Sequence, residues 1–283
     1  MNDTLYIIGN GFDLHHGLKT TYANFREEQA KKTPILWNNL LTIYGDEPYS
    51  DQWWWNFEAM LGKIDYTKIM NSNNGMALGA NKVSSLLTGI LPPFFGKWIK
   101  DIDNNIDISK MQKEEYIDNN ALFFSFNYTM LLEKLYNVPK ENVWHIHNSV
   151  MSIDNIIIGH DSDERELFRE YLKYKEERGI IRSDIADNIR REAAKGAKDV
   201  NNRIIRHNDD FHRLYPDIQH IIAMGFSFND IDMPYIKEIV EVNNNIADVH
   251  WTLYFHSDGD DIRMKNKLIQ IGIKEECINF KKW

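Results

Sequence analysis

Residues 5–13 restrict the fold of this chain more than any other segment. The apolar run Leu5–Ile8 predicts a short buried strand, and the turn Gly9-Asn10-Gly11 leads to a helix that starts near Asp13. Glycines let a backbone approach a ligand closely, and a helix N-terminus supplies free N–H groups and partial positive charge, so this arrangement suits a phosphate. We therefore expect the fold to open with its nucleotide-binding strand. The alternative is a purely structural strand-to-helix turn.

The spacing of this turn departs from known phosphate-binding fingerprints. A dinucleotide fingerprint has a third glycine three residues after the second, where this chain has Leu14, and the next glycine is Gly17. The Gly-Lys-Ser/Thr of an ATP-binding loop does not occur in the sequence. The turn alone therefore leaves phosphate binding and a structural role both open.

Charge and cysteine content narrow the class of protein. The chain of 283 residues has 33 basic and 42 acidic residues and a net charge of −9, which argues against broad electrostatic affinity for nucleic acid or anionic membrane. Cys277 is the only cysteine, so disulfide frameworks and cysteine-rich zinc sites are excluded. The sequence has no signal-peptide pattern and no apolar run long enough to span a membrane. We expect a soluble cytoplasmic protein.

Short apolar runs alternate with longer amphipathic segments along the chain. Most of the runs are continuously apolar, as in strands buried on both faces, and this predicts an α/β, Rossmann-like fold with a mainly parallel sheet flanked by helices. We expect a single domain over residues 1–283 with two helical insertions at about 22–118 and 161–215. The expected strands are Leu5–Ile8, Ala121–Phe126, Val143–His147, Asn155–Ile158, Ile218–Met224 and Val249–His256.

An amide and two histidines follow two of these strands. Asn127 stands at the carboxyl end of Ala121–Phe126, the edge where ligands of open α/β sheets bind, but it could equally cap a helix over Thr129–Tyr136. On a strand, His145 and His147 point to the same face. They could bind a metal, one of them could act as a general base, or each could be a satisfied buried histidine. The residues that keep the metal alternative open are His160, Asp161, Asp163, His15 and His16.

The last polar cluster follows the strand Ile218–Met224. Gly225 permits close backbone approach, and Ser227 and Asn229 can bond a sugar or a phosphate. One of Asp230 and Asp232 is expected to cap the helix Met233–Val240. In the first insertion, the run Trp53-Trp54-Trp55 predicts core or lid packing, and Glu58 predicts a surface ion pair.

Six motifs follow one another along the chain in a fixed order. They are Gly9-Asn10-Gly11-Phe12-Asp13-Leu14, Gly17-Leu18-Lys19-Thr20-Thr21-Tyr22, Phe126-Asn127-Tyr128-Thr129, His145-Ile146-His147-Asn148, Ile158-Gly159-His160 and Gly225-Phe226-Ser227-Phe228-Asn229-Asp230. This series resembles the AbiH family of bacterial phage abortive-infection proteins from about residue 5 to residue 256. That family in turn looks like a divergent branch of the sirtuin-like NAD-binding domains.

The resemblance implies hydrolysis of NAD at the bond between nicotinamide and ribose. Asn127 and His147 would be the catalytic residues, and Asn148 replaces the glycine that follows the sirtuin histidine. NAD would be the substrate, with no metal, and the one cysteine argues against a zinc-dependent deacetylase. The residues implied in NAD binding are Gly9, Asn10, Gly11, Phe12, Asp13, Gly225, Ser227 and Asp230.

Two other functions stay open at this stage. One is a metal-dependent phosphoesterase or nuclease, and the other is a nucleotide-sensing module without catalysis that controls a partner. We expect an abortive-infection protein to be inactive until a phage or host trigger acts. Activation by assembly into a homo-oligomer would suit that role.

Overall fold

The computed structural model describes residues 3–64, 69, 75–160, 172 and 183–283. The chain forms two compact units, each with its own packing. We call the first the sheet unit; it comprises Met1–Thr20, Ile99–Ser152 and Val200–Trp283. The second, the helical unit, comprises Thr21–Trp98 and Ile153–Asp199.

The sheet unit is built on six parallel strands in the order β3-β2-β1-β4-β5-β6. The chain starts at the centre, runs outward in one direction, then returns and runs outward in the other, so the strand order reverses between β1 and β4. Ligands of such doubly wound sheets bind at this reversal, outside the carboxyl ends of the strands. The predicted α/β, Rossmann-like fold is confirmed. The strands are β1 (Thr4–Ile8), β2 (Leu122–Ser125), β3 (Val143–His145), β4 (His220–Met224), β5 (His250–Phe255) and β6 (Ile278–Lys282).

Five of the six predicted strands are present, and two details were wrong. The predicted strand Asn155–Ile158 is absent, since residues 156–158 have no regular secondary structure. The edge strand β6 was missed because Asn279, Lys281 and Lys282 break its apolar pattern, and an edge strand needs only one buried side.

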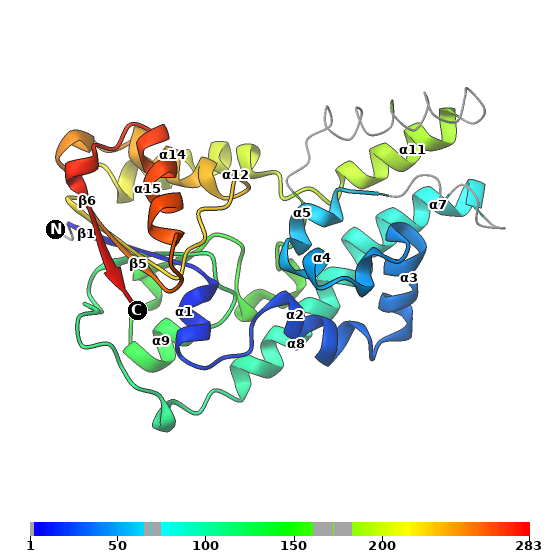
Figure 1. Ribbon diagram of the computed structural model, residues 1–283, viewed down its shortest axis with the longest axis horizontal. Helices are drawn as coiled ribbons and strands as arrows, with labels where there is room; N and C mark the ends of the chain where they lie inside the picture. The colour runs from blue at the N-terminus through cyan, green and yellow to red at the C-terminus, as the bar shows by residue number, and fades with distance from the viewer. Residues whose placement is uncertain (1–2, 65–68, 70–74, 161–171, 173–182) are drawn as a thin grey trace. The chain divides into compact units, whose positions relative to one another are not determined.

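Side chains of the sheet alternate between two apolar cores. Along β1, Leu5 and Ile7 pack into one core, whereas Tyr6 and Ile8 pack into the other. Helices α12 to α15 supply the first core and helices α1 and α9 the second, so helices cover both faces (Figure 1). These helices are α1 (Asn10–His15), α9 (Leu131–Tyr136), α12 (Val200–Arg206), α13 (Asn208–Leu214), α14 (Met233–Glu241) and α15 (Asp260–Gln270).

The helical unit has an aromatic core. Trp54 stacks on Phe57 with ring centroids 4.7 Å apart, and Phe25 packs against both rings. The predicted packing role of the tryptophan run holds for Trp53 and Trp54, but Trp55 is 83% exposed. Its helices are α2 (Tyr22–Phe25), η1 (Arg26–Ala30), α3 (Pro34–Tyr44), η2 (Glu47–Tyr49), α4 (Asp51–Trp55), α5 (Phe57–Leu61), α7 (Gly75–Ser84), η3 (Ser85–Ile90), α11 (Ser183–Ala194) and α8 (Leu91–Asn104), which continues into the sheet unit.

In the described residues both expected insertions contain helices, but stretches such as residues 111–118 and 195–199 are not helical. Residues 22–118 contain no strand in the parts 22–64 and 75–118. Of the second insertion, residues 161–171 and 173–182 lie outside the described residues, and its end, α12 and α13, packs on the sheet. Glu58 pairs with Lys198 at 2.9 Å, and both side chains are largely buried, so the expected surface ion pair is an interior one. The single domain over residues 1–283 stays a prediction.

Candidate active site at the carboxyl edge of the sheet

Four of the motifs lie at one edge of the sheet. Gly9 and the start of α1 follow β1, Asn127 follows β2, His147 follows β3, and the loop at residues 225–232 follows β4. The helix α1 begins at Asn10, so its expected start near Asp13 was wrong, and Gly9-Asn10-Gly11 leads directly from the strand into the helix. Because β3, β2, β1 and β4 are neighbours and run in the same direction, all four loops leave the sheet at its carboxyl edge.

The loops after β1 and β4 pack against each other backbone to backbone. Gly9 N–H donates to the Met224 carbonyl (3.0 Å), and Gly11 N–H donates to the Gly225 carbonyl (2.9 Å). A Cβ atom on Gly9 would lie 2.5 Å from Phe226 Cα, and one on Gly225 would lie 2.1 Å from the Phe12 nitrogen. Gly225 also has a φ of +63°, which other residues rarely adopt. These glycines are therefore required for the two loops to meet.

This packing uses N–H groups that a phosphate would need. Gly9, Gly11 and Phe12 all donate to carbonyls of the protein itself. Phe12 is fully buried against Tyr136 and Trp283. Asn10 is exposed, and its Oδ1 accepts from the Thr20 hydroxyl at 2.7 Å. The predicted phosphate role of the turn stays a prediction, with Asn10 as its accessible member.

Asp13 ties the first helix to the loop after β2. Its carboxylate is 2% exposed and accepts from Asn127 Nδ2 (2.9 Å) and from the Thr129 hydroxyl (2.9 Å to Oδ2). Burial raises the pKa of Asp13 to about 7, against the lowering effect of these two hydrogen bonds. The capping alternative for Asn127 is wrong, because α9 begins at Leu131 after Met130, and the Met130 N–H donates to Asp103 Oδ1 at 2.8 Å.

The Asn127 amide is left with one unsatisfied atom. With Nδ2 bonded to Asp13, its Oδ1 is buried and has no hydrogen-bond partner among the described residues. A buried polar atom without a partner costs about 1–3 kcal/mol, and such atoms are rare. An unsatisfied acceptor at the ligand-binding edge of the sheet is the kind of group that a ligand satisfies.

Both ring nitrogens of His145 lie within hydrogen-bond distance of acceptors in the protein. It is the last residue of β3, and its Nδ1 lies 2.9 Å from the Asn127 carbonyl while its Nε2 lies 3.0 Å from Glu133 Oε1. Both partners are acceptors, so both hydrogen bonds form together only when the ring carries two protons. His145 is thus the satisfied histidine of the sequence alternatives, and Glu133 of α9 is a partner that the sequence did not indicate.

His147 has different surroundings, although it is only two residues away. It lies in the turn after β3, beyond the strand, so the expected shared strand face with His145 is wrong. Its ring is 2% exposed among the rings of Phe126, Tyr128 and Tyr235. The next residue, Asn148, has a φ of +62°, a conformation that asparagine tolerates better than most residues.

An acid from the loop after β4 faces His147. Asp232 Oδ1 lies 3.5 Å from His147 Nε2, and both side chains are largely buried. Asp232 directly precedes α14, yet its carboxylate makes no capping hydrogen bond in the described structure. The buried Phe228, with a φ of +53°, lies in the loop that leads to this acid. A carboxylate beside an imidazole orients the ring and stabilises its protonated form.

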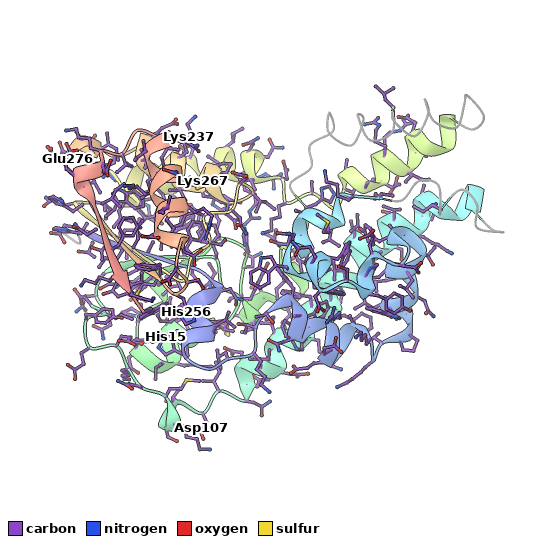
Figure 2. All side chains as sticks on the ribbon, viewed as in Figure 1. His15, Asp107, Lys237, His256, Lys267 and Glu276 are labelled. Atoms are coloured by element: carbon purple, nitrogen blue, oxygen red, sulfur yellow. The ribbon has the colours of Figure 1, made fainter. Side chains whose placement is uncertain are left out.

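Two predicted binding residues of this loop, Asp230 and Ser227, are exposed to solvent. Asp230 is 82% exposed and forms an ion pair with Lys267 of α15, the residue labelled in Figure 2. Ser227 is exposed, and its carbonyl accepts from Arg263 of the same helix. Asp232, which sequence reasoning left between a cap and an open role, is therefore the acid at the candidate site. Only the folded path of the loop distinguishes it from Asp230.

The histidines proposed for a metal site are scattered. His160 belongs to the helical unit, where its Nε2 bonds the Ala193 carbonyl at 2.9 Å. His15, labelled in Figure 2, stacks on Trp283 and pairs with Glu114 at 2.7 Å. Asp161 and Asp163 lie outside the described residues. Within the described ranges, no group of three or more His, Cys, Asp or Glu side chains could hold a metal ion.

The fold and the site define a doubly wound α/β protein with an imidazole, a carboxylate and an amide at the ligand-binding edge of its sheet. The sequence model of the family described as Bacteriophage abortive infection AbiH matches residues 5–85 and 80–255. The chain belongs to the AbiH family of phage abortive-infection proteins, as its motifs predicted. No curated protein and no solved structure matches it. None of the described helices is both long and apolar enough to cross a bilayer.

Proposed function

We propose that this protein is an abortive-infection effector that hydrolyses NAD at the bond between nicotinamide and ribose. Membership of the AbiH family supports the defence role. The single observation that carries the chemistry is the pair His147–Asp232, on loops that leave the carboxyl edge of the sheet together with the loop of Asn127. Nucleotides bind at this edge of doubly wound sheets.

The reaction needs few protein groups, because nicotinamide bound as a cation is already a good leaving group. Water attacks the anomeric carbon of the ribose, and the carbon–nitrogen bond breaks with its electron pair going to nicotinamide. His147 takes the proton of the attacking water, and Asp232, 3.5 Å away, stabilises the imidazolium that results. Asn127 Oδ1 accepts a hydrogen bond from a ribose hydroxyl or from the water. The products are ADP-ribose, nicotinamide and a proton released from His147.

The exposed polar groups of the two glycine-containing loops contact the phosphate part of NAD in this proposal. Asn10 follows β1, and Ser227 follows β4. Lys267 and Arg263 of α15 lie beside the second loop, where they form ion pairs with Asp230 and Asp260, so a phosphate that binds them replaces one of these carboxylates. The glycines act indirectly, since they allow the two loops to meet.

Burial of the catalytic groups implies that the described state is closed. Asn127 is 5% exposed and His147 is 2% exposed, so a nucleotide reaches them only when surrounding side chains move. Such opening fits an effector that stays silent until a trigger acts, and lid motions of this kind limit many enzymes.

The test is nicotinamide release by the purified full chain incubated with NAD, alone and with lysate of phage-infected cells. We expect release by the triggered wild type, and its loss in His147→Ala and Asn127→Ala. His220→Ala is the matched control, because this exposed histidine begins β4 at the opposite edge of the sheet. A triggered preparation that is toxic to cells but leaves NAD intact rules the function out.

A second candidate, nucleotide sensing without turnover, is favoured by the same burial. A buried site that holds its ligand without cleaving it would switch a partner by changing shape when the ligand binds. Stoichiometric binding of ADP-ribose without any nicotinamide release, before and after triggering, would select this function.

A further inference from the structure

We propose that Asp13 is a positioning residue that fixes the Asn127 amide, so that this residue offers an acceptor oxygen to a bound ligand and selects a hydroxyl donor. The ligand half of this proposal rests on the proposed function, whereas the positioning half rests on the geometry of the free protein. No sequence motif assigns this role, since Asp13 itself was expected to touch NAD.

The geometry leaves the amide one orientation while Asp13 is ionised. A carboxylate only accepts hydrogen bonds, so it binds Asn127 through Nδ2, at 2.9 Å, and turns Oδ1 away. The Thr129 hydroxyl lies 3.1 Å from Asp13 Oδ1 and 2.9 Å from Oδ2, which holds the carboxylate in place. The amide is thereby set before any ligand arrives.

The orientation decides which part of a nucleotide fits beside Asn127. Oδ1 is buried and lacks a partner among the described residues, and it can only accept a hydrogen bond. A ribose hydroxyl or a water molecule donates and satisfies it. A phosphate oxygen would instead face this oxygen, with the Asp13 carboxylate behind it, and would be repelled. The arrangement therefore assigns Asn127 to the sugar and the phosphates to another part of the site.

The same geometry makes the amide sensitive to a single proton. Protonated Asp13 can donate to Oδ1, and the amide can then turn and present Nδ2 instead. The charged groups that face Asp13 are Asp103 of α8 and His145 of β3, which act in opposite directions, while Asn127 and Thr129 face it as neutral donors. Because burial raises the pKa of Asp13 to about 7, both states are populated near neutral pH. Affinity for a hydroxyl donor then rises with pH through this range.

The positioning half is tested by NMR on the full chain labelled with 15N-asparagine. The side-chain amide signal of Asn127 is identified by its loss in Asn127→Asp. We expect it to titrate with a midpoint near pH 7 in the wild type and to lose that midpoint in Asp13→Asn. Thr129→Val keeps the carboxylate but removes a bond that lowers its pKa, so the midpoint should move upward. An Asn127 signal that does not titrate in the folded wild type overturns the proposal.

The ligand half is tested by calorimetry with ADP-ribose and with analogues in which one ribose hydroxyl at a time is replaced by fluorine. At about pH 8, one replacement should weaken wild-type binding by about tenfold or more, and this penalty should shrink in Asp13→Asn. Equal binding of all analogues overturns hydroxyl selection. If ADP-ribose does not bind, both the proposed function and the selection of a ribose hydroxyl by Asn127 are contradicted. The NMR titration does not depend on a ligand, so it still tests whether Asp13 positions the amide.

Discussion

His145 and His147 belong to one short motif, yet the structure gives them opposite environments. Both nitrogens of His145 lie at hydrogen-bond distance from acceptors, the Asn127 carbonyl and Glu133. His147 lies among aromatic rings, and its distance of 3.5 Å to Asp232 is longer than a strong charge-assisted hydrogen bond. Both ring nitrogens of His145 face protein acceptors, whereas His147 faces Asp232 among aromatic rings.

The two environments give the two histidines different roles: His145 stabilises the fold, and His147 is suited to proton transfer. A ring with both nitrogens in short hydrogen bonds stabilises the fold but has no site left for a substrate proton. A ring beside one carboxylate can exchange a proton and return to its starting state. The end of β3 at His145 produces this division, because the turn that follows aims His147 away from the strand face of its neighbour.

Replacement of each histidine in turn by glutamine is expected to show the largest difference. His147→Gln should lower the rate of nicotinamide release about 100- to 10,000-fold, because the general base is lost while the volume is nearly kept. His145→Gln should keep most of the rate per folded molecule. Initial rates at saturating NAD, corrected for the folded fraction by circular dichroism, measure both. If the two variants lose activity equally, the division between the two histidines does not exist.

The acid beside His147 should give the next largest effect. Asp232→Asn keeps the shape but removes the charge that stabilises the imidazolium, and we expect a loss of about 10- to 100-fold in turnover. The pH profile of the rate should also change, since the base loses its ionised neighbour. Asp209→Asn, an exposed acid in the first turn of α13, is the matched control. An unchanged pH profile in Asp232→Asn would separate this carboxylate from the chemistry.

The network around His145 should instead show its effect in stability. Glu133→Gln replaces a charge-assisted hydrogen bond by a neutral one, at a cost of about 1–3 kcal/mol in the free energy of unfolding. Urea unfolding followed by fluorescence measures this, and Glu141→Gln, on an exposed residue of η5 (Lys140–Asn142), should change it by less than about 0.5 kcal/mol. A large loss of turnover in folded Glu133→Gln would place His145 in the chemistry after all.

The sequence predicts the fold well because the central strands are apolar on both faces. Runs such as Leu5–Ile8 have few other stable places than the middle of a parallel sheet. The edge strand β6 was not predicted, because its polar residues are tolerated at the edge of a sheet and break the apolar pattern. The strand predicted at Asn155–Ile158 was wrong, because an apolar run also occurs in loops that pack on helices.

The candidate site was predictable in part. Asn127 and His147 follow β2 and β3 as the motif order predicts, although β3 ends at His145 and His147 lies beyond it rather than on the strand. The partners were not predictable, because Asp13 and Asp232 lie 114 and 85 residues away from them in sequence (127 − 13 and 232 − 147). Side-chain direction in the loop after β4, which sends Asp232 inward and Asp230 outward, depends on φ values that a sequence does not reveal.

The last expected effect is a change in how the free energy of unfolding depends on pH, caused by the carboxylate of Asp13. Burial raises the pKa of Asp13 in the folded chain to about 7, above the ordinary value of 3.8, so its contribution to stability is full below pH 3.8 and is lost as pH rises toward 7. Between about pH 5 and 7, the wild type should lose stability relative to Asp13→Asn by up to about 1.4 kcal/mol per pH unit. Above about pH 8 the difference should be constant. Urea unfolding of both proteins across this range measures it. A difference that stays constant from pH 5 upward would mean that Asp13 stays ionised, and the polar network around His145 would then carry a permanent buried charge.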